Sequence, residues 1–257
     1  MTLMDTHAHL DDKRLKKDLP GVMARAKQKG VTKIVTVGTD LRTSEQAIEI
    51  AKSYDDVYAT VGVHPHDAKN VPTHYINELE RLVQTDREHI IALGEMGLDY
   101  YRNLSPKDSQ QAVFRSQLGL AKELDLPVII HDRAAHADTL NIVSDHLTDQ
   151  LRGVFHCFGG DVTVAEEVLK LGFSISFTGN ITFDKADKLR AVVQATPLDK
   201  IMLETDCPYM APVPFRGKRN EPAYVRLVAD MVAELKGIEF EDVVAQTGKN
   251  ARELFLF

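Results

Sequence analysis

The stretch Leu3-Met4-Asp5-Thr6-His7-Ala8-His9 begins with an apolar run and ends in two histidines that lie two positions apart. In a β-strand the side chains alternate between the two faces, so residues i and i+2 point to the same side. His7 and His9 can therefore bind one metal ion together if this segment is a strand. Later apolar runs end at or near four further potential ligands: Glu95, His131, His156 and Asp206. This recurrence indicates a metal site assembled from the ends of several strands.

Eight apolar or β-branched runs recur along the chain, and each is followed by a segment that can form a helix. The expected strands are 3–6, 31–38, 57–63, 90–94, 127–131, 153–157, 172–178 and 201–205. The expected helices are 19–29, 44–53, 74–85, 109–124, 135–147, 162–171, 185–194, 223–235 and 240–254.

The alternation of strand and helix favours a parallel sheet with right-handed crossovers, and eight units favour closure into a barrel over an open doubly wound sheet. We therefore predict the α/β class and a TIM (β/α)8 barrel, with a single domain over residues 1–257. In such barrels the chemistry lies at the C-terminal ends of the strands, which is where the candidate ligands fall. No glycine-rich phosphate loop follows the first strand.

Length and composition describe an ordered protein with a substantial core. The 257 residues match one eight-unit barrel, although two small domains are also compatible with this length. The chain begins without a basic segment followed by an apolar one, and no run approaches the roughly 18 uninterrupted apolar residues of a membrane span. We therefore expect a cytoplasmic protein without a membrane partner.

Cys157 and Cys207 are too few for a disulfide framework and are compatible with a reducing compartment. Each follows a candidate ligand, so strand alternation would turn both thiols to the opposite face, where we expect them to pack as small buried side chains. The net charge of −7 argues against a surface that binds duplex nucleic acid non-specifically. It leaves room for a local phosphate site.

The candidate ligands form a mixed set of four histidines, one glutamate and one aspartate. Imidazole suits zinc, and carboxylates also admit magnesium and manganese, so the set does not identify the ion. With Glu95 between two groups of ligands, two divalent ions (Mg, Mn or Zn) can activate a water and stabilise the attacking and leaving oxygens of a displacement. This arrangement favours hydrolysis, particularly of phosphoesters, with Glu95 and Asp206 as the catalytic carboxylates.

Ordered blocks over nearly the whole chain resemble the signature blocks of the TatD family of metal-dependent deoxyribonucleases. Five blocks contain candidate ligands: Asp5-Thr6-His7-Ala8-His9-Leu10, Gly94-Glu95-Met96-Gly97-Leu98-Asp99-Tyr100-Tyr101, His131-Asp132-Arg133, His156-Cys157-Phe158-Gly159-Gly160 and Glu204-Thr205-Asp206-Cys207-Pro208. The others are Gly62-Val63-His64-Pro65-His66, Thr178-Gly179-Asn180-Ile181-Thr182-Phe183 and residues 211–222.

The resemblance implies a TIM-like barrel of the amidohydrolase type that holds two divalent ions. By motif, one ion would be held by His7, His9, Glu95 and Asp206. The other would be held by Glu95, His131 and His156. The departures from the usual pattern are minor and remove no candidate ligand: Ala8, Asp132, Cys207 and Met210.

Several other residues are candidates for substrate contacts. His64 and His66 repeat the His-x-His spacing, so they are either a third ligand pair or substrate contacts, and we favour the second role for His64 because six other ligands already fill two sites. Tyr101 and Arg102 follow the Glu95 strand in a polar loop, where they can stack on a base or hold a phosphate. Ordinary loop packing is the alternative.

Basic residues near the ends of other strands extend this set. Arg216 and Arg219, with Lys218 between them, give a positive loop after the last strand, and phosphates bind there in barrels of this kind; a solvated turn is the alternative. We also expect Arg133 to contact the substrate. Glu204 shares the Asp206 face by alternation, so it is expected to support a ligand from behind or to neutralise a buried basic group.

The leading functional hypothesis is a deoxyribonuclease that removes nucleotides from DNA ends, because a recessed barrel mouth admits a single-stranded end more easily than the middle of a duplex. DNA ends or single-stranded DNA are then the expected partner, RNA stays open, and no obligate protein partner is evident. A rival hypothesis is hydrolysis of amides, lactones or esters, including aminoacyl-tRNA, because activated water also attacks carbonyls. A non-catalytic metal-binding protein is less favoured, because the ligand set lacks no member.

Overall fold

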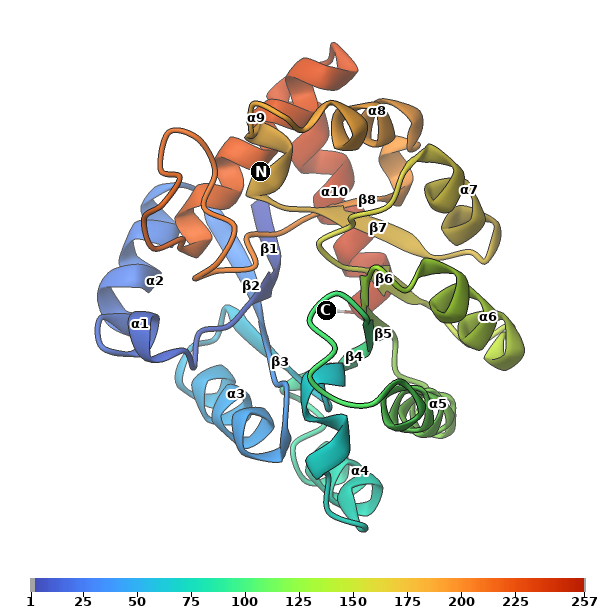
Figure 1. Ribbon diagram of the computed structural model, residues 1–257. Coiled ribbons are helices and arrows are strands. Elements are labelled where there is room, and N and C mark those ends of the chain that lie inside the picture. The colour runs from blue at the N-terminus through green and yellow to red at the C-terminus, as the bar shows by residue number, and fades with distance from the viewer. Residues whose placement is uncertain (1–2, 257) are drawn as a thin grey trace.

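Eight parallel strands, paired in the order β1 to β8, form the centre of the computed structural model, which describes residues 3–256 (Figure 1). The strands are β1 Leu3–Ala8, β2 Val31–Val37, β3 Val57–Val61, β4 Ile90–Asp99, β5 Val128–Arg133, β6 Gly153–Phe155, β7 Ser174–Phe177 and β8 Ile201–Leu203. A parallel bridge between Ala8 and Cys207 closes the ring between the first and last strands. The predicted α/β class and (β/α)8 barrel are confirmed.

Helices surround the barrel (Figure 1). They are α1 Lys13–Lys16, α2 Leu19–Gln28, α3 Leu41–Ser53, α4 Tyr75–Thr85, α5 Lys107–Glu123, α6 His136–His146, α7 Val162–Lys170, α8 Asp187–Ala195, α9 Val225–Lys236 and α10 Phe240–Phe255. Short 3-10 helices are η1 Pro65–Asn70, η2 Gly179–Thr182, η3 Leu198–Lys200 and η4 Pro222–Tyr224. In α4 the buried residues Tyr75, Leu79, Leu82 and Val83 follow helical spacing, so one apolar stripe faces the strands.

The apolar core consists of two clusters, one between the strands and the helices and one inside the barrel. The larger cluster packs the outward faces of the strands against the helices. The smaller cluster includes Met4, Ile91, Ile129 and Met202 from four strands, together with Phe255 from α10. α10 thus covers the end of the barrel where the strands begin, and the polar candidate ligands lie at the other end. Within residues 3–256 every helix is too short or too polar to traverse a bilayer.

The strand ends differ from the sequence-based expectation in ways that matter for the site. β4 continues to Asp99 instead of ending at residue 94, so Glu95 lies inside a strand. β6 and β8 are shorter than expected, and the residues beyond them, Cys157 and Asp206, have left-handed φ values of 44° and 54°. Strand alternation therefore does not set side-chain directions there. The expectation for the thiols was wrong for Cys157, which is only partly buried, whereas Cys207 is buried.

Two glycines beside Glu95 allow β4 to approach β5 closely. Gly94 and Gly97 both have φ 137°, a value that side chains other than glycine rarely adopt. A Cβ on Gly94 would lie 2.6 Å from the Ile129 carbonyl oxygen, and one on Gly97 would overlap with the carbonyl oxygen of His131. The Gly94–Glu95 peptide is cis. Glycine at these positions therefore brings the Glu95 strand against the His131 strand.

Replacing Gly97 by Ala should lower the free energy of unfolding by at least about 2 kcal/mol, because it adds both steric overlap and backbone strain. Replacing Gly119 by Ala is the matched control. Gly119 lies within α5, where a Cβ meets open space among the described residues, so alanine should stabilise the helix by up to about 1 kcal/mol. Urea denaturation measures the free energy of unfolding of both variants. A Gly97→Ala protein as stable as the wild type would show that the two strands need no such approach.

Candidate metal centre

The two oxygens of the Glu95 carboxylate face different histidines. Oε2 lies 3.4 Å from His7 Nε2 and 3.8 Å from His9 Nε2, both on β1 or directly after it. Oε1 lies 2.7 Å from His131 Nδ1 on β5 and 2.7 Å from His156 Nε2 after β6. The Glu95 side chain is only 4% exposed, so these neighbours, and not water, must compensate its charge.

Asp206 completes the group around Oε2. Its Oδ1 lies 3.3 Å from His9 Nε2 and 3.8 Å from His7 Nε2. The backbone places it there: the Asp206 N–H donates to the carbonyl oxygen of His7 at 2.9 Å, beside the bridge that closes the barrel. All six side chains that the sequence suggested as ligands therefore meet at one end of the barrel. Their roles as ligands stay predictions.

The spacing around Oε2 fits a shared ion better than direct hydrogen bonds. The contacts of 3.3–3.8 Å are longer than a strong hydrogen bond between charged groups. Two ligand atoms that each lie about 2.1 Å from one tetrahedral ion are separated by about 3.4 Å. Around Oε1, His131 forms a 2.7 Å hydrogen bond and His156 a 2.7 Å ion-pair contact, so this side is more contracted. Both sides offer the nitrogen and oxygen donors that divalent metals prefer.

His7 supplies a further test of the fit. Both ring nitrogens of His7 are buried and lack a hydrogen-bond partner within residues 3–256. The ring stacks on His156, with centroids 4.0 Å apart and planes 9° apart. A buried polar atom without a partner is costly, and an ion at Nε2 would remove that cost. The donor chemistry and this unsatisfied nitrogen together fit a metal between the side chains.

Burial and charge give the two β1 histidines opposite protonation behaviour. Burial, together with the neighbouring His156, lowers the pKa of His7, so its ring is neutral and can offer a lone pair. Burial also disfavours a charged His9, but Asp206 and Glu95 outweigh this and raise the pKa of His9 to about 9.

Burial and neighbouring charges also act in opposite directions on the pKa values around Oε1. Burial alone would raise the pKa of Glu95, but His156, His64 and His131 outweigh it and hold that pKa well below its usual value. Burial opposes charge on His131 and His156, but hydrogen bonds and ion pairs with nearby carboxylates raise both pKa values. These shifts give an ionised Glu95 carboxylate and protonated rings whose protons a bound ion would displace.

Asp99 supports the site from behind His131 and was missed as a functional residue in the sequence. Its Oδ2 lies 3.3 Å from His131 Nε2 and 2.8 Å from His66 Nε2. A carboxylate on the far nitrogen of a histidine ligand fixes the orientation of its ring. The spacing of two residues could have indicated Asp99, because Glu95, Gly97 and Asp99 share one face when the strand continues to residue 99.

Glu204 supports His156 in a similar way. It is buried, and its Oε1 lies 3.5 Å from His156 Nδ1 and accepts a hydrogen bond from the Cys157 N–H at 2.7 Å. Ser176 donates to its other oxygen. The expectation of an acid that supports a ligand from behind agrees with this geometry.

His64 lies within reach of the site, with Nε2 at 3.4 Å from Glu95 Oε1. Burial lowers the pKa of His64 to about 4, so its ring is neutral. Its Nδ1 accepts a hydrogen bond from the His66 N–H at 3.1 Å, which places the remaining proton on Nε2. His64, Glu95 and His131 also offer donor atoms close enough together to hold an ion, so the geometry is compatible with both expected roles of His64, a further ligand and a substrate contact.

The predicted substrate contacts separate into two groups. Tyr101 is 67% exposed at the barrel mouth, and Arg133 lies over its ring at 4.2 Å from the centroid. Arg102 is exposed, and its backbone N–H donates to Asp99 Oδ1 at 2.7 Å. These residues border the Oε1 side of the site and can reach a substrate.

The arginines after β8 are partly engaged with protein groups. Arg219 donates to the carbonyl oxygen of Arg14 at 2.8 Å and lies 3.5 Å from both Asp18 Oδ2 and Glu221 Oε2. These carboxylates neutralise much of its charge, which favours a structural role over the expected phosphate contact. Arg216 is exposed and lies over the Phe183 ring at 4.2 Å. It remains a candidate for phosphate binding.

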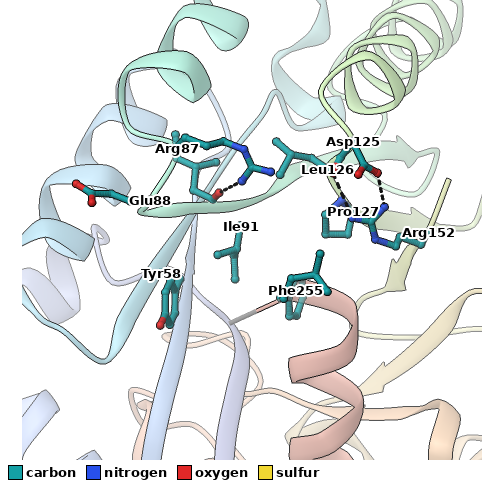
Figure 2. Close-up of a pocket in the computed structure, with 11 residues that line it drawn as sticks. Tyr58, Arg87, Glu88, Ile91, Asp125, Leu126, Pro127, Arg152 and Phe255 are labelled. Carbon is teal, nitrogen blue, oxygen red and sulfur yellow. Dashed lines mark hydrogen bonds and ion pairs between the residues drawn. The ribbon is translucent and has the colours of Figure 1, made fainter. Parts of the chain in front are cut away.

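A hollow of about 380 Å³ lies at the opposite end of the barrel, near the starts of β4 and β6 (Figure 2). Its arginines are engaged: Arg87 donates to the carbonyl oxygen of Ile90 at 3.1 Å, and Arg152 donates to Asp125 Oδ1 at 2.7 Å. Its lining, drawn from the described residues, contains no member of the predicted ligand set. In this fold, that end serves stability and not chemistry.

Comparisons with known proteins cover nearly the whole chain. The family described as "TatD related DNase" matches residues 4–256. The "uncharacterized metal-dependent hydrolase YabD" of Bacillus subtilis is 45% identical over 253 residues, or 98% of both chains. The "3'-5' ssDNA/RNA exonuclease TatD" of Erwinia amylovora is 35% identical over 98% of this chain and 99% of its own length. The crystal structure of YJJV, a TatD homolog from Escherichia coli, has a TM-score of 0.94 and 30% identity, over 99% of this chain and 98% of that one.

Metal affinity should weaken as the pH falls, because the raised pKa values of His9, His131 and His156 mean that protons compete with the ion for the rings. Between about pH 8 and pH 6, the dissociation constant for Zn²⁺ or Mn²⁺ should rise by about tenfold per pH unit for each proton displaced. Calorimetric titration in buffers of different ionisation enthalpy measures both affinity and proton release. Binding that is independent of pH would contradict this description.

Proposed function

Because this chain belongs to the family of TatD-related DNases and is a metal-dependent hydrolase, we propose that it is an exonuclease that removes nucleotides from the ends of single-stranded DNA. The observation that carries the proposal is the division of five buried or partly buried candidate ligand side chains between the two oxygens of Glu95. Support comes also from relatives named 3'-5' ssDNA/RNA exonuclease.

We assign His7, His9 and Asp206 to one ion and His131 and His156 to a second ion, with Glu95 between them. When bound, two divalent ions would lower the pKa of a water molecule and neutralise charge on the phosphodiester. The ions' identity, among Mg, Mn and Zn, does not follow from the donor set. The buried carboxylate itself holds the two groups of ligands in a fixed relation, and Asp99 and Glu204 hold the rings behind it.

Asp206 is the residue we assign to proton transfer. Burial would raise its pKa, but His9, His7 and His156 outweigh burial and lower it, so the carboxylate is ionised near neutral pH. Its Oδ1 faces the β1 histidines. A carboxylate so placed can accept a proton from the attacking water.

His64 and the Tyr101–Arg133 pair are the side chains we assign to substrate positioning. His64 Nε2 lies 3.4 Å from Glu95 Oε1, so an Nε2–H is placed at the site where it can donate to a phosphate oxygen that enters. Tyr101 offers an exposed ring to a nucleobase, and Arg133 lies beside it as a cation. We keep the cytoplasm as the expected compartment, because both cysteines are free.

A substrate panel tests the proposal. The purified protein, loaded with Mg²⁺, Mn²⁺ or Zn²⁺, is incubated with end-labelled single-stranded DNA, duplex DNA, RNA, a circular single strand, and a set of amides, lactones and esters that includes an aminoacyl-tRNA. We expect stepwise shortening of linear single-stranded DNA and an intact circle. Cleavage of the circle would contradict the exonuclease assignment. Turnover restricted to the carbonyl compounds would replace the nuclease with a carbonyl hydrolase.

Asp206→Asn should lower kcat by roughly 10²- to 10⁴-fold, with less change in KM, because asparagine keeps the shape and one oxygen but loses the basicity. Steady-state kinetics on labelled single-stranded DNA at saturating metal measures both constants. Metal analysis should still find ions in the variant.

Asp67→Asn is the matched control, because it removes the same charge from η1 at the same end of the barrel. Its kcat should stay within about twofold of the wild-type value, since surface substitutions of this kind are usually mild. A kcat of Asp206→Asn within a few-fold of wild type would show that Asp206 only anchors its turn, where asparagine is also tolerated.

A further inference from the structure

Exposed apolar side chains gather on two loops at the metal-site end of the barrel. Tyr101 and Leu104 follow β4, and Tyr209 and Val213 follow β8. Large apolar side chains that stay exposed beside a site often mark a binding surface. Tyr101 was expected from the sequence to contact substrate, whereas Tyr209 was not.

The two tyrosines lie on opposite sides of the mouth. The strands pair in the order β1 to β8 and close between β8 and β1, so β4 and β8 are half a turn apart. Tyr209 is 48% exposed, and its ring centroid lies 6.0 Å from that of His9, on the Oε2 side of Glu95. Tyr101 follows β4, whose partner β5 carries His131 on the Oε1 side. The metal centre therefore lies between two exposed aromatic rings.

The Tyr209 backbone is held firmly in place. Its N–H donates to the carbonyl oxygen of Asp206 at 2.9 Å. Its carbonyl oxygen accepts from Asn220 Nδ2 at 2.6 Å, and Asn220 is fully buried. A fixed backbone reduces the conformational entropy that is lost when a ligand stacks on the ring.

Arg14 backs the Tyr209 ring, with its guanidinium carbon 4.5 Å from the ring centroid. Asp12 holds this guanidinium through two hydrogen bonds, of 2.9 Å from Nε and 2.8 Å from Nη2. Arg219 donates to the Arg14 carbonyl oxygen at 2.8 Å. The same arrangement of tyrosine and arginine occurs across the mouth, where Arg133 lies over Tyr101.

We propose that Tyr209, backed by Arg14, is a second base-stacking subsite, and that the substrate is a single strand whose nucleobases stack on Tyr209 and Tyr101 on either side of the scissile phosphate. This inference rests on the proposed nuclease function and specifies its substrate. Bases in a duplex already stack on one another, so only an unpaired strand offers free faces. Because Asp12 neutralises Arg14, the subsite contributes stacking and little charge attraction to phosphate.

The test combines protein variants with modified oligonucleotides. Labelled single strands carry one abasic nucleotide at each position in turn. Wild type, Tyr209→Ala, Tyr209→Phe and Tyr101→Ala are compared. Binding is measured by fluorescence anisotropy in the presence of a chelator, and kcat/KM is measured separately with metal. Leu147→Ala is the matched control, because it removes an exposed apolar side chain, 41% exposed, that follows α6.

Tyr209→Ala should weaken binding and lower kcat/KM by about 10- to 100-fold, and its dependence on salt should match that of the wild type. Tyr209→Phe and Leu147→Ala should stay close to wild type. In the wild type, an abasic nucleotide at one position should lower the affinity and kcat/KM by about as much as Tyr209→Ala does. In the Tyr209→Ala protein, the same abasic nucleotide should lower both quantities by less than about twofold, because the ring on which the missing base would stack is absent. Tyr101→Ala should show the same loss of sensitivity at a position across the scissile phosphate.

Equal sensitivity of wild type and Tyr209→Ala to every abasic position would overturn the subsite while leaving the nuclease function intact. Binding that shows the position-specific coupling, without any hydrolysis of the strand, would support the subsite and reject the nuclease. A wild-type protein that neither binds nor cleaves the strands would reject both. Loss of sensitivity at the same position in both tyrosine variants would contradict the placement on opposite sides.

Discussion

The burial of one ionised carboxylate, Glu95, constrains the polar half of this barrel. A charge removed from water is strongly unfavourable unless opposite charges or hydrogen-bond donors surround it. Glu95 meets this condition through histidines from three strands: His7 and His9 from β1 on the side of Oε2, and His131 and His156, from β5 and after β6, on the side of Oε1. The pKa values of His9, His131 and His156 are raised, so protons on these three rings compensate its charge, and bound metal ions would do the same. The charge of this one side chain therefore accounts for the histidines that surround it and for a site able to hold cations.

Keeping the imidazoles aimed at Glu95 requires a second set of contacts. Asp99 and Glu204 lie behind His131 and His156, and the glycines beside Glu95 let the neighbouring strand come close enough for direct contact. The apolar cluster at the other end of the barrel, which α10 covers, is separate from these polar side chains. Substitutions of the polar side chains can therefore change the chemistry while the apolar cluster preserves the fold, as is usual in such barrels.

The sequence was sufficient for the barrel and for the convergence of the candidate ligands, because both follow from periodicity and from the position of polar residues after apolar runs. It was insufficient where local backbone departs from a strand. The left-handed conformation of Cys157 removed the basis for inferring its side-chain direction, and the continuation of β4 brought Asp99 onto the Glu95 face. Two partners of Arg219, Arg14 and Asp18, lie about 200 residues away, so no local pattern reveals that its guanidinium is engaged. The tautomer of His64 depends on a single backbone N–H.

The central proposal is that Glu95 would hold two metal ions, one at each oxygen. Crystals soaked in Mn²⁺ and measured at the manganese absorption edge test it directly, because anomalous scattering locates each ion without prior assignment of ligands. Two anomalous peaks are expected, both in contact with Glu95. The ligands of the first peak should be His7, His9 and Asp206, and those of the second His131 and His156. A single peak, or two peaks that Glu95 does not touch, would contradict it.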